Sequence, residues 1–564
     1  MPILSNILPK QTPSPGFVAW PYIDTLYDYV KFLANGAPIA TLPQAKWGTQ
    51  VAIVGSGAAG LVAAFELLRI GAQPVIFEAT ERIGGRARSQ PFIDPDGNES
   101  KTDFAELGSM RFPPSGKSFF YYVNLFKLAV SGQFPDPGTV PTMLYYENTA
   151  IPWPAGQVAP KGFEKISQDW GNFITGLITP LYNAWQLAQQ NGDWQPVIQL
   201  WQGIIDKYKD MSFFEAVHQG LPDWTDEELD KFGALGIGSG GFGPLYSVSF
   251  LELMRIVVNM WEDKQQLLTN GVTGLMKAFY STPVTIPSGQ NVSLQDLDAL
   301  KLNMRVDGIQ YLNGQPTLYF SDDCAPPQAF DAVIVATTTR SMEVIGLTLP
   351  PEQGPDIIDQ DVKVAIRNLH LMDSSKLFIR TKTKFWKDPT RNIPQNIQTD
   401  ELPRGVYTLD YPQTEHGIVL VSYVWGDDSS KLLPLSKTAR LELFKKSIAK
   451  ASPEFAAHLV PMHGVEDIIK IDWEDEAFYF GAFKLNYPGQ EPILQAAYYQ
   501  FLTVNNASAD RGVYIAGDSV SWSSGWTEGA LQTGINAACA AAQRIGATVR
   551  SSSPLTQNPN LYQY

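Results

Sequence analysis

A strand–helix–strand pattern near the N-terminus limits the folds open to this chain more than any other feature. An apolar, β-branched run at 51–54 leads directly into a glycine-rich segment at 55–60, and a helical stretch continues to Gly71. A second apolar run at 74–77 ends at Glu78. Two strands joined by a helix of this length pair in parallel, because the helix carries the chain back across the sheet. We therefore expect an α/β fold.

The glycine-rich segment has the spacing G-x-G-x-x-G, formed by Gly55, Gly57 and Gly60. The first glycine permits a tight turn, the second lets the backbone approach a pyrophosphate, and the third lets the helix pack closely on the strand. The helix N-terminus then stabilises the phosphate charge. A carboxylate about 20 residues further on is suited to bind ribose hydroxyls. The pattern predicts a dinucleotide site made by Gly55, Ser56, Gly57, Ala58, Gly60, Glu78 and Ala79.

Composition and charge exclude some kinds of partner. The chain has 564 residues and a net charge of −15, whereas a nucleic-acid partner would require a basic face. No apolar run approaches the ~20 residues needed to cross a bilayer, and the N-terminus has no secretory signal pattern. We expect a cytoplasmic protein with neither a nucleic-acid nor a membrane partner, built from about two or three packed units.

The chain offers little material for disulfides or metal sites. Its two cysteines, Cys324 and Cys539, lie far apart in the sequence, and its five histidines show no ligand spacing. Neither a disulfide framework nor a CxxC metal pair can be built from them. We expect no metal.

Two further segments indicate which dinucleotide binds. The segment 81–89 reads ERIGGRARS, and near the C-terminus Ala516-Gly517-Asp518 follows an apolar run and precedes a helical stretch at 529–545. Together with the first glycine motif, these segments resemble the three FAD signatures of the flavin amine oxidase family. The resemblance implies non-covalent FAD, because both cysteines lie outside the family's attachment motif. It adds these expected FAD contacts: Gly85, Arg86, Gly108, Met110, Arg111, Val306, Gly517, Asp518, Trp526 and Thr527.

The run AELGSMRFP at 105–113 resembles one branch of that family, the bacterial tryptophan, phenylalanine and lysine oxidases and 2-monooxygenases. The resemblance implies that Arg111 pairs bidentately with the substrate carboxylate. A planar guanidinium suits that task, and a buried guanidinium needs an anion. The alternative is that Arg111 forms a salt bridge with Glu106 or another local acid.

The same resemblance assigns several other residues to the active site. It implies that Lys376 holds a water near the reactive flavin nitrogen, that Trp526 walls the substrate cavity, and that the Gly525 carbonyl accepts the substrate ammonium. Phe480 and Tyr423 are candidates for the pocket wall, although each could instead serve only packing. The expected catalytic residues are Arg111, Lys376 and Trp526.

Two positions depart from the pattern or vary within it. Lysine-specific members carry acidic residues just after a Gly-Gly-aromatic run, whereas the segment 240–246 here reads GGFGPLY. A basic side chain would be left unpaired there, so we expect a neutral, apolar or aromatic substrate side chain. Trp261 lies at a position that varies in this branch and bears on the fate of the reduced flavin, and the sequence assigns it no role.

The expected reaction is oxidation of an L-amino acid by hydride transfer from Cα to FAD, with O2 as the second substrate. An oxidase would release the imino acid, which hydrolyses to the 2-oxo acid and ammonia, together with H2O2. The alternative is a 2-monooxygenase, in which the retained imino acid is attacked by peroxide and yields an amide and CO2. A third reading, an amine oxidase for substrates without a carboxylate, would leave Arg111 unpaired.

The resemblance also implies the architecture: a Rossmann-like FAD-binding domain of the GR2 type, a substrate domain on a mixed sheet, and a helical insertion. Family members are commonly homodimers or larger homo-oligomers, which is the expectation here. The polar C-terminal tail is expected to be loosely ordered. The expected boundaries are an N-terminal arm at 1–46, FAD-binding parts at 47–115, 246–345 and 496–550, a helical region at 116–245, a substrate domain at 346–495 and a tail at 551–564.

Overall fold

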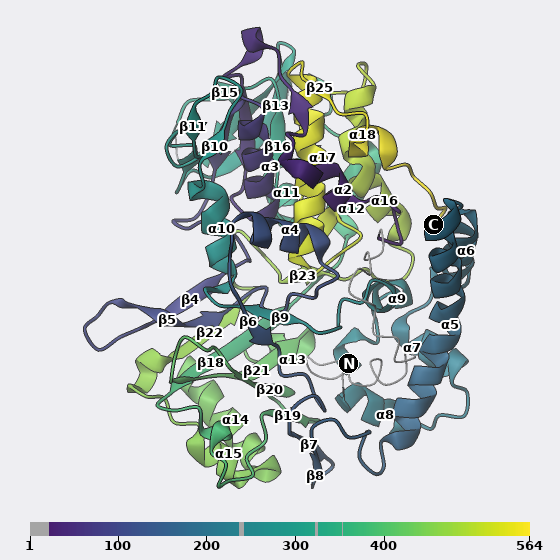
Figure 1. Cartoon of the computed structure of the whole chain (residues 1–564), viewed down its shortest axis with the longest axis vertical. Coiled ribbons are helices and arrows are strands. Elements are labelled where there is room, and N and C mark those ends of the chain that lie inside the picture. The colour runs from purple at the N-terminus through teal and green to yellow at the C-terminus, as the bar shows by residue number, and fades with distance from the viewer. Residues whose placement is uncertain (1–21, 236–241, 322–324, 352–353) are drawn as a thin grey trace.

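The computed structural model describes residues 22–235, 242–321, 325–351 and 354–564 (Figure 1). Two β-sheets form separate layers, one in the upper half of the view and one in the lower half, and a group of helices runs along one side. Among these described residues, no helix combines the length and the apolar character required to cross a bilayer.

The upper layer is a five-stranded sheet whose paired strands all run in parallel. Its two strands from the N-terminal motif are connected by helix α3 (Ala58–Arg69), so the expected strand–helix–strand unit is confirmed. The strands are short and apolar, as expected where helices cover both faces of a parallel sheet. In spatial order they are β12 (Leu300–Lys301), β3 (Gln73–Phe77), β2 (Gln50–Val54), β16 (Val333–Val335) and β24 (Val513–Ile515).

Helix α17 (Thr527–Arg544) packs directly against α3, although the two are separated by most of the chain (Figure 1). The contact depends on Gly534, because a Cβ there would lie 2.5 Å from both the Ala59 carbonyl oxygen and a Val62 methyl group. Nearly every residue of α17 is buried. The close approach brings the beginnings of both helices to the same region, since each begins just after a strand of the parallel sheet.

The lower layer is a seven-stranded mixed sheet, as expected from the family resemblance. Its strands pair antiparallel except for one parallel pair, β19 with β7. Helices α14 (Lys437–Ala451) and α15 (Pro453–His458) lie against it and share an apolar core with it. In spatial order the strands are β22 (Ile468–Asp472), β18 (Ser374–Thr381), β21 (Gly417–Trp425), β20 (Gly405–Leu409), β19 (Asn396–Thr399), β7 (Thr142–Tyr146) and β8 (Thr149–Trp153).

Among the described residues between 164 and 258, five helices lie along one side of the molecule (Figure 1). In the longest of them, the buried residues Ile166, Trp170, Ile174, Ile178, Leu181 and Trp185 recur every three or four positions and form one apolar face. Trp170 and Trp185 therefore serve helix packing. The helices are α5 (Glu164–Asn191), α6 (Gln195–Tyr208), α7 (Phe213–Gly220), α8 (Asp226–Leu235) and α9 (Phe250–Val258).

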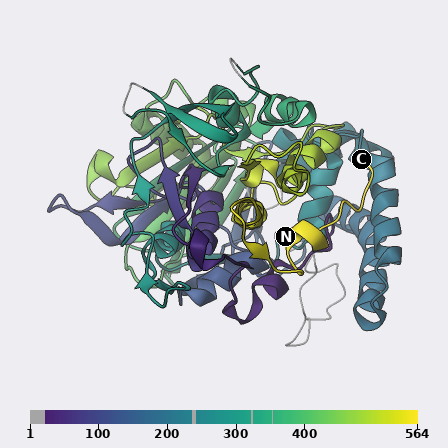
Figure 2. The same cartoon turned by 90° about the horizontal axis from the view of Figure 1, so that it is seen from above.

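The C-terminal tail is not loosely ordered, so that expectation is wrong. The Tyr562 hydroxyl donates to the Ile23 carbonyl over 2.7 Å, and Tyr564 stacks on Trp522 with ring centroids 4.8 Å apart. The tail reaches the outer helices (Figure 2), where its Gln563 amide donates to the side chain of Gln202. The tail is polar on average, but Tyr562 is buried and Tyr564 is partly buried, and their apolar rings cover neighbouring segments.

Candidate active site

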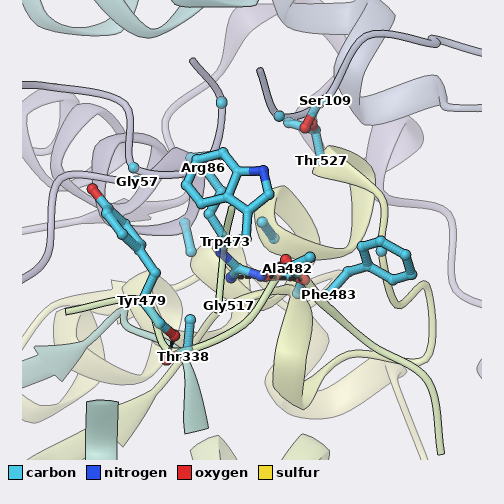
Figure 3. Close-up of a pocket in the computed structure, with 18 of the residues that line it drawn as sticks. Gly57, Arg86, Ser109, Thr338, Trp473, Tyr479, Ala482, Phe483, Gly517 and Thr527 are labelled. Atoms are coloured by element: carbon cyan, nitrogen blue, oxygen red, sulfur yellow. Dashed lines mark hydrogen bonds and ion pairs between the residues drawn. The ribbon is translucent and has the colours of Figure 1, made fainter. Parts of the chain in front are cut away.

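A cavity of about 340 Å³ lies between the parallel sheet and the mixed sheet. It is lined by the segments that follow β2, β3 and β24, by the beginning of α17, and by side chains of β18 and β21. Figure 3 shows part of the lining, with Gly57, Trp473, Tyr479 and Phe483 arranged around the open space. Ligands of open parallel sheets bind at the carboxyl ends of the strands, and this cavity has that position.

The three glycines of the first motif meet different structural requirements. Gly55 has a φ of +102°, which favours glycine, and a Cβ at Gly60 would lie 2.0 Å from the Gly55 carbonyl oxygen. Gly57, by contrast, lines the cavity, and a Cβ there would meet nothing within 4 Å. Gly55 and Gly60 are therefore needed by the fold itself, whereas Gly57 leaves space for a ligand to approach the backbone.

Glu78 lies at the end of β3 and is held in place by its neighbours. Its Oε2 accepts hydrogen bonds from the Ser56 amide and hydroxyl at 2.9 and 2.7 Å, and its Oε1 accepts from the amide and hydroxyl of Thr80. Ser56 is fully buried and positions Glu78. The four acceptor sites of the carboxylate are thus occupied, and a ribose hydroxyl would bind in place of the Ser56 or the Thr80 hydroxyl.

Arg86 and Asp518 form an ion pair at the cavity although 432 positions separate them in the chain. Asp518 follows Gly517, whose φ of +137° turns the chain sharply at the end of β24. Close by, the first turns of α3 and α17 contribute Ala58, Trp526 and Thr527 to the lining. Two helix N-termini beside a guanidinium make this end of the cavity favourable for a pyrophosphate and for an electron-rich ring.

Arg111 is largely buried, and its counter-ion is Glu262. Arg111 Nη1 lies 3.3 Å from Glu262 Oε2, and the guanidinium also lies over the ring of Phe134. Burial lowers the pKa of Arg111, but the nearby carboxylate of Glu262 outweighs this effect, so the pKa is raised overall. The local partner considered from the sequence, Glu106, instead accepts hydrogen bonds from Ser89 and Val272. No spacing in the sequence marks Glu262, which lies 151 positions after Arg111.

Lys376 lies on β18 with its side chain buried in the cavity wall. Its Nζ donates to the Glu106 carbonyl over 3.1 Å and to the Gly108 carbonyl over 2.6 Å, and it faces the ring of Tyr423. Burial is the main cause that lowers the pKa of Lys376 to about 7, and Arg111 lowers it further while Glu106 opposes the change. Lys376 therefore changes charge near neutral pH, which a surface lysine does not.

We expect the rate of L-amino acid oxidation to rise with pH through about 7, because Lys376 becomes neutral there. Hydride loss from Cα builds positive charge on the substrate, and a neighbouring ammonium opposes that charge. In Lys376→Met, the rate of cofactor reduction should not rise with pH in this range. Glu106→Gln is the control: Glu106 raises the pKa of Lys376, so its replacement should move the rise to lower pH. If the rate in Lys376→Met still rises with pH through about 7, Lys376 is not the group that causes the rise.

Aromatic side chains cover the side of the cavity next to Arg111. Trp526 stacks on Trp261 with ring centroids 5.2 Å apart, and Trp261 stacks in turn on Tyr22. Trp425, which the sequence analysis missed, also lines the cavity two positions after Tyr423 on β21. Alternate residues of a strand share one face, so the position of Tyr423 was a signal that could have identified Trp425.

The structure places nearly all the residues predicted from the sequence around this one cavity. Ser56 and Gly60 are the exceptions: they lie behind the lining, where they support Glu78 and the α3–β2 contact. Gly240, Gly241 and Cys324 lie outside the described residues, and Cys539 is buried within α17. The predicted residues that line the cavity are Gly55, Gly57, Ala58, Glu78, Ala79, Gly85, Arg86, Gly108, Met110, Arg111, Val306, Lys376, Tyr423, Phe480, Gly517, Asp518, Gly525, Trp526 and Thr527.

Comparison with known proteins agrees with this arrangement. Residues 58–542 match the family described as flavin containing amine oxidoreductase. The chain is 37% identical to a tryptophan 2-monooxygenase from Pantoea agglomerans pv. gypsophilae, over 97% of this chain and 98% of the relative. It is 35% identical to a tryptophan 2-monooxygenase from Pseudomonas savastanoi, over 96% and 99% of the two chains. It is also 24% identical to a phenylalanine 2-monooxygenase precursor from a Pseudomonas species, over 90% and 88%.

Solved structures of similar fold are more distant in sequence. A putrescine oxidase superposes with a TM-score of 0.65 at 16% identity, covering 88% of this chain and 99% of its own. A cyclohexylamine oxidase from Brevibacterium oxydans IH-35A gives a TM-score of 0.63 at 15% identity, with the same coverage. At these identities the likeness concerns the fold alone.

Proposed function

The chain belongs to the flavin containing amine oxidoreductase family, and within it we propose that the protein is an FAD-dependent L-amino acid 2-monooxygenase acting on tryptophan or a similar aromatic amino acid. The relatives that share 33–37% identity over nearly the whole chain are named tryptophan 2-monooxygenases. These names favour the monooxygenase, which was the alternative reading of the sequence, over the oxidase that was expected first.

For L-tryptophan the balanced reaction consumes one O2 and yields 2-(indol-3-yl)acetamide, CO2 and water. The Cα–carboxyl carbon bond breaks, one oxygen atom enters the amide, and the other leaves as water. When bound, FAD accepts the hydride from Cα and passes the two electrons to dioxygen. The protein contributes binding, orientation and the exclusion of water.

The residues present fit FAD. The open space at Gly57 and the α3 N-terminus would accept the pyrophosphate, while Glu78 would accept hydrogen bonds from a ribose. Arg86 and Asp518 would contact the phosphate and ribityl groups, and the α17 N-terminus would stabilise negative charge on the reduced ring.

The observation that carries the substrate assignment is the buried guanidinium of Arg111 in an aromatic part of the cavity next to this glycine cradle. Arg111 would bind the substrate carboxylate, and the Gly525 carbonyl would accept from the amino group, so that Cα is oriented toward the cofactor. Trp473 and Trp526 line the same cavity and offer flat apolar surfaces to an aromatic side chain. The monooxygenase outcome also requires that the imino acid remains in the site until peroxide attacks it.

Aerobic product analysis with L-tryptophan and L-phenylalanine tests the proposal. We expect the amide with one carbon fewer and an equal amount of CO2, with label from 18O2 in the amide. Formation of 2-oxo acid, ammonia and H2O2 in place of the amide would identify an oxidase instead. D-tryptophan is the control for stereochemistry, and turnover of tryptamine without turnover of tryptophan would support an amine oxidase.

A further inference from the structure

Glu262 is a buried carboxylate in the substrate cavity that the predicted site did not include. It follows α9, its side chain is 6% exposed, and it contacts Arg111 by a single oxygen at 3.3 Å. This distance is longer than the roughly 2.7–2.9 Å typical of strong charge-assisted hydrogen bonds. Glu262 therefore offsets the charge of Arg111 but does not engage its whole guanidinium fork.

A second acid, Asp136, is buried near this pair but does not line the cavity. Burial is the main cause that raises its pKa to about 6, and the charge of Glu262 raises it further while that of Arg111 lowers it. Lys376, with a pKa of about 7, carries only part of a positive charge near neutral pH. At the proposed position of the substrate carboxylate, the cavity thus presents the full charge of Arg111 with the carboxylate of Glu262 beside it.

The buried pair of Arg111 and Glu262 distinguishes ligands by the charged groups that they carry. A carboxylate that approaches Arg111 also approaches Glu262, and like charges in a buried site repel strongly because water screens them little. A zwitterionic amino acid carries an ammonium group next to its carboxylate, and this group offsets the repulsion. A carboxylate without an amino group has no such compensation.

We propose that Glu262 makes the cavity selective for zwitterionic amino acids over carboxylates that lack an amino group. The inference rests on the proposed role of Arg111 as the carboxylate site and extends it. Glu262 disfavours the binding of deaminated analogues and of 2-oxo acids that resemble the substrate. The selectivity comes from the negative charge of Glu262. If Glu262 only positioned Arg111, its loss would weaken the binding of all carboxylates equally.

Glu262→Gln separates the two roles, because glutamine keeps the shape and a hydrogen-bond acceptor but removes the charge. In the FAD-loaded enzyme we expect the inhibition constant of 3-(indol-3-yl)propionate to fall at least about tenfold. The dissociation constant of tryptamine should rise by a similar factor, and the ratio of the propionate's inhibition constant to KM for L-tryptophan should fall at least about fivefold. Isothermal titration of the propionate and of tryptamine, the latter in the absence of O2, and inhibition of L-tryptophan turnover provide these constants.

Asp263→Asn is the matched control. It removes one negative charge at the adjacent position, but Asp263 is exposed and does not line the cavity. Water screens its charge, so all three constants should change much less than in Glu262→Gln. Equal weakening of the propionate and L-tryptophan in Glu262→Gln would mean that Glu262 only positions Arg111, and would overturn the proposal. Unchanged binding of the propionate would overturn it as well.

The wild-type enzyme provides a test that does not depend on the variant folding. Wild-type protein should bind 3-(indol-3-yl)propionate at least about tenfold more weakly than L-tryptophan. Equal affinity for the two, in an enzyme that turns over L-tryptophan, would overturn the inference about Glu262 and leave the proposed function standing. Failure of the wild-type enzyme to turn over any L-amino acid would instead refute the proposed function.

Discussion

Replacement of Arg111 by alanine is expected to lower kcat/KM for L-tryptophan by roughly two hundredfold to several thousandfold. Removing one partner of a buried ion pair costs about 3–5 kcal/mol, because the remaining charge loses its compensation. Here both the substrate carboxylate and Glu262 would lose their counter-ion. Most of the loss should appear in KM, since Arg111 contacts the part of the substrate that binds before Cα reacts. Steady-state kinetics over a wide range of substrate concentration measure the effect.

Arg111→Lys keeps the positive charge but removes the planar fork, so we expect it to restore only part of the lost activity. Flavin content and thermal unfolding of both variants serve as controls for an intact fold. An unchanged KM for amino acids in Arg111→Ala would show that the substrate carboxylate binds elsewhere.

Replacement of Gly57 by valine is expected to abolish FAD binding, with a loss of affinity greater than about a hundredfold, while the chain still folds. Gly57 has φ −72° and ψ −178°, a backbone conformation open to any residue, and a side chain there meets no protein atom within 4 Å. The valine would instead occupy the space through which a pyrophosphate approaches the backbone. The ratio of flavin to protein absorbance after purification, and titration of the apoprotein with FAD, test this expectation.

Gly60→Ala is the contrasting variant in the same motif. Its Cβ would lie 2.0 Å from the Gly55 carbonyl oxygen, so the α3 helix must shift on the sheet. We expect the fold itself to be destabilised by about 1–3 kcal/mol or more, as for other overpacked positions. The apoprotein should therefore unfold at a lower temperature than the apoprotein of Gly57→Val. Normal FAD binding by Gly57→Val would contradict the assignment of this cradle.

The parts of the fold that local spacing encodes could be predicted. The strand–helix–strand unit, its glycines and Glu78 lie within one short stretch, and the backbone requirements of each residue follow from its neighbours. The mixed sheet and most of the residues that line the cavity followed from resemblance to a family. The expectation that the C-terminal tail is loosely ordered was wrong. Composition does not reveal that Tyr562 donates to the Ile23 carbonyl and that Tyr564 donates to Asp24.

The sequence by itself predicted the dinucleotide cradle, because a short motif carries its own geometric requirements, and resemblance to a family marked Arg111 and Lys376 as candidates. Only the tertiary structure placed Glu262 beside Arg111 and joined Arg86 to Asp518. It also showed that burial brings the pKa of Lys376 to about 7. These properties arise where segments distant in sequence exclude water from the same charges. The strength of those charges depends on what surrounds them, and that is decided only when the chain has folded.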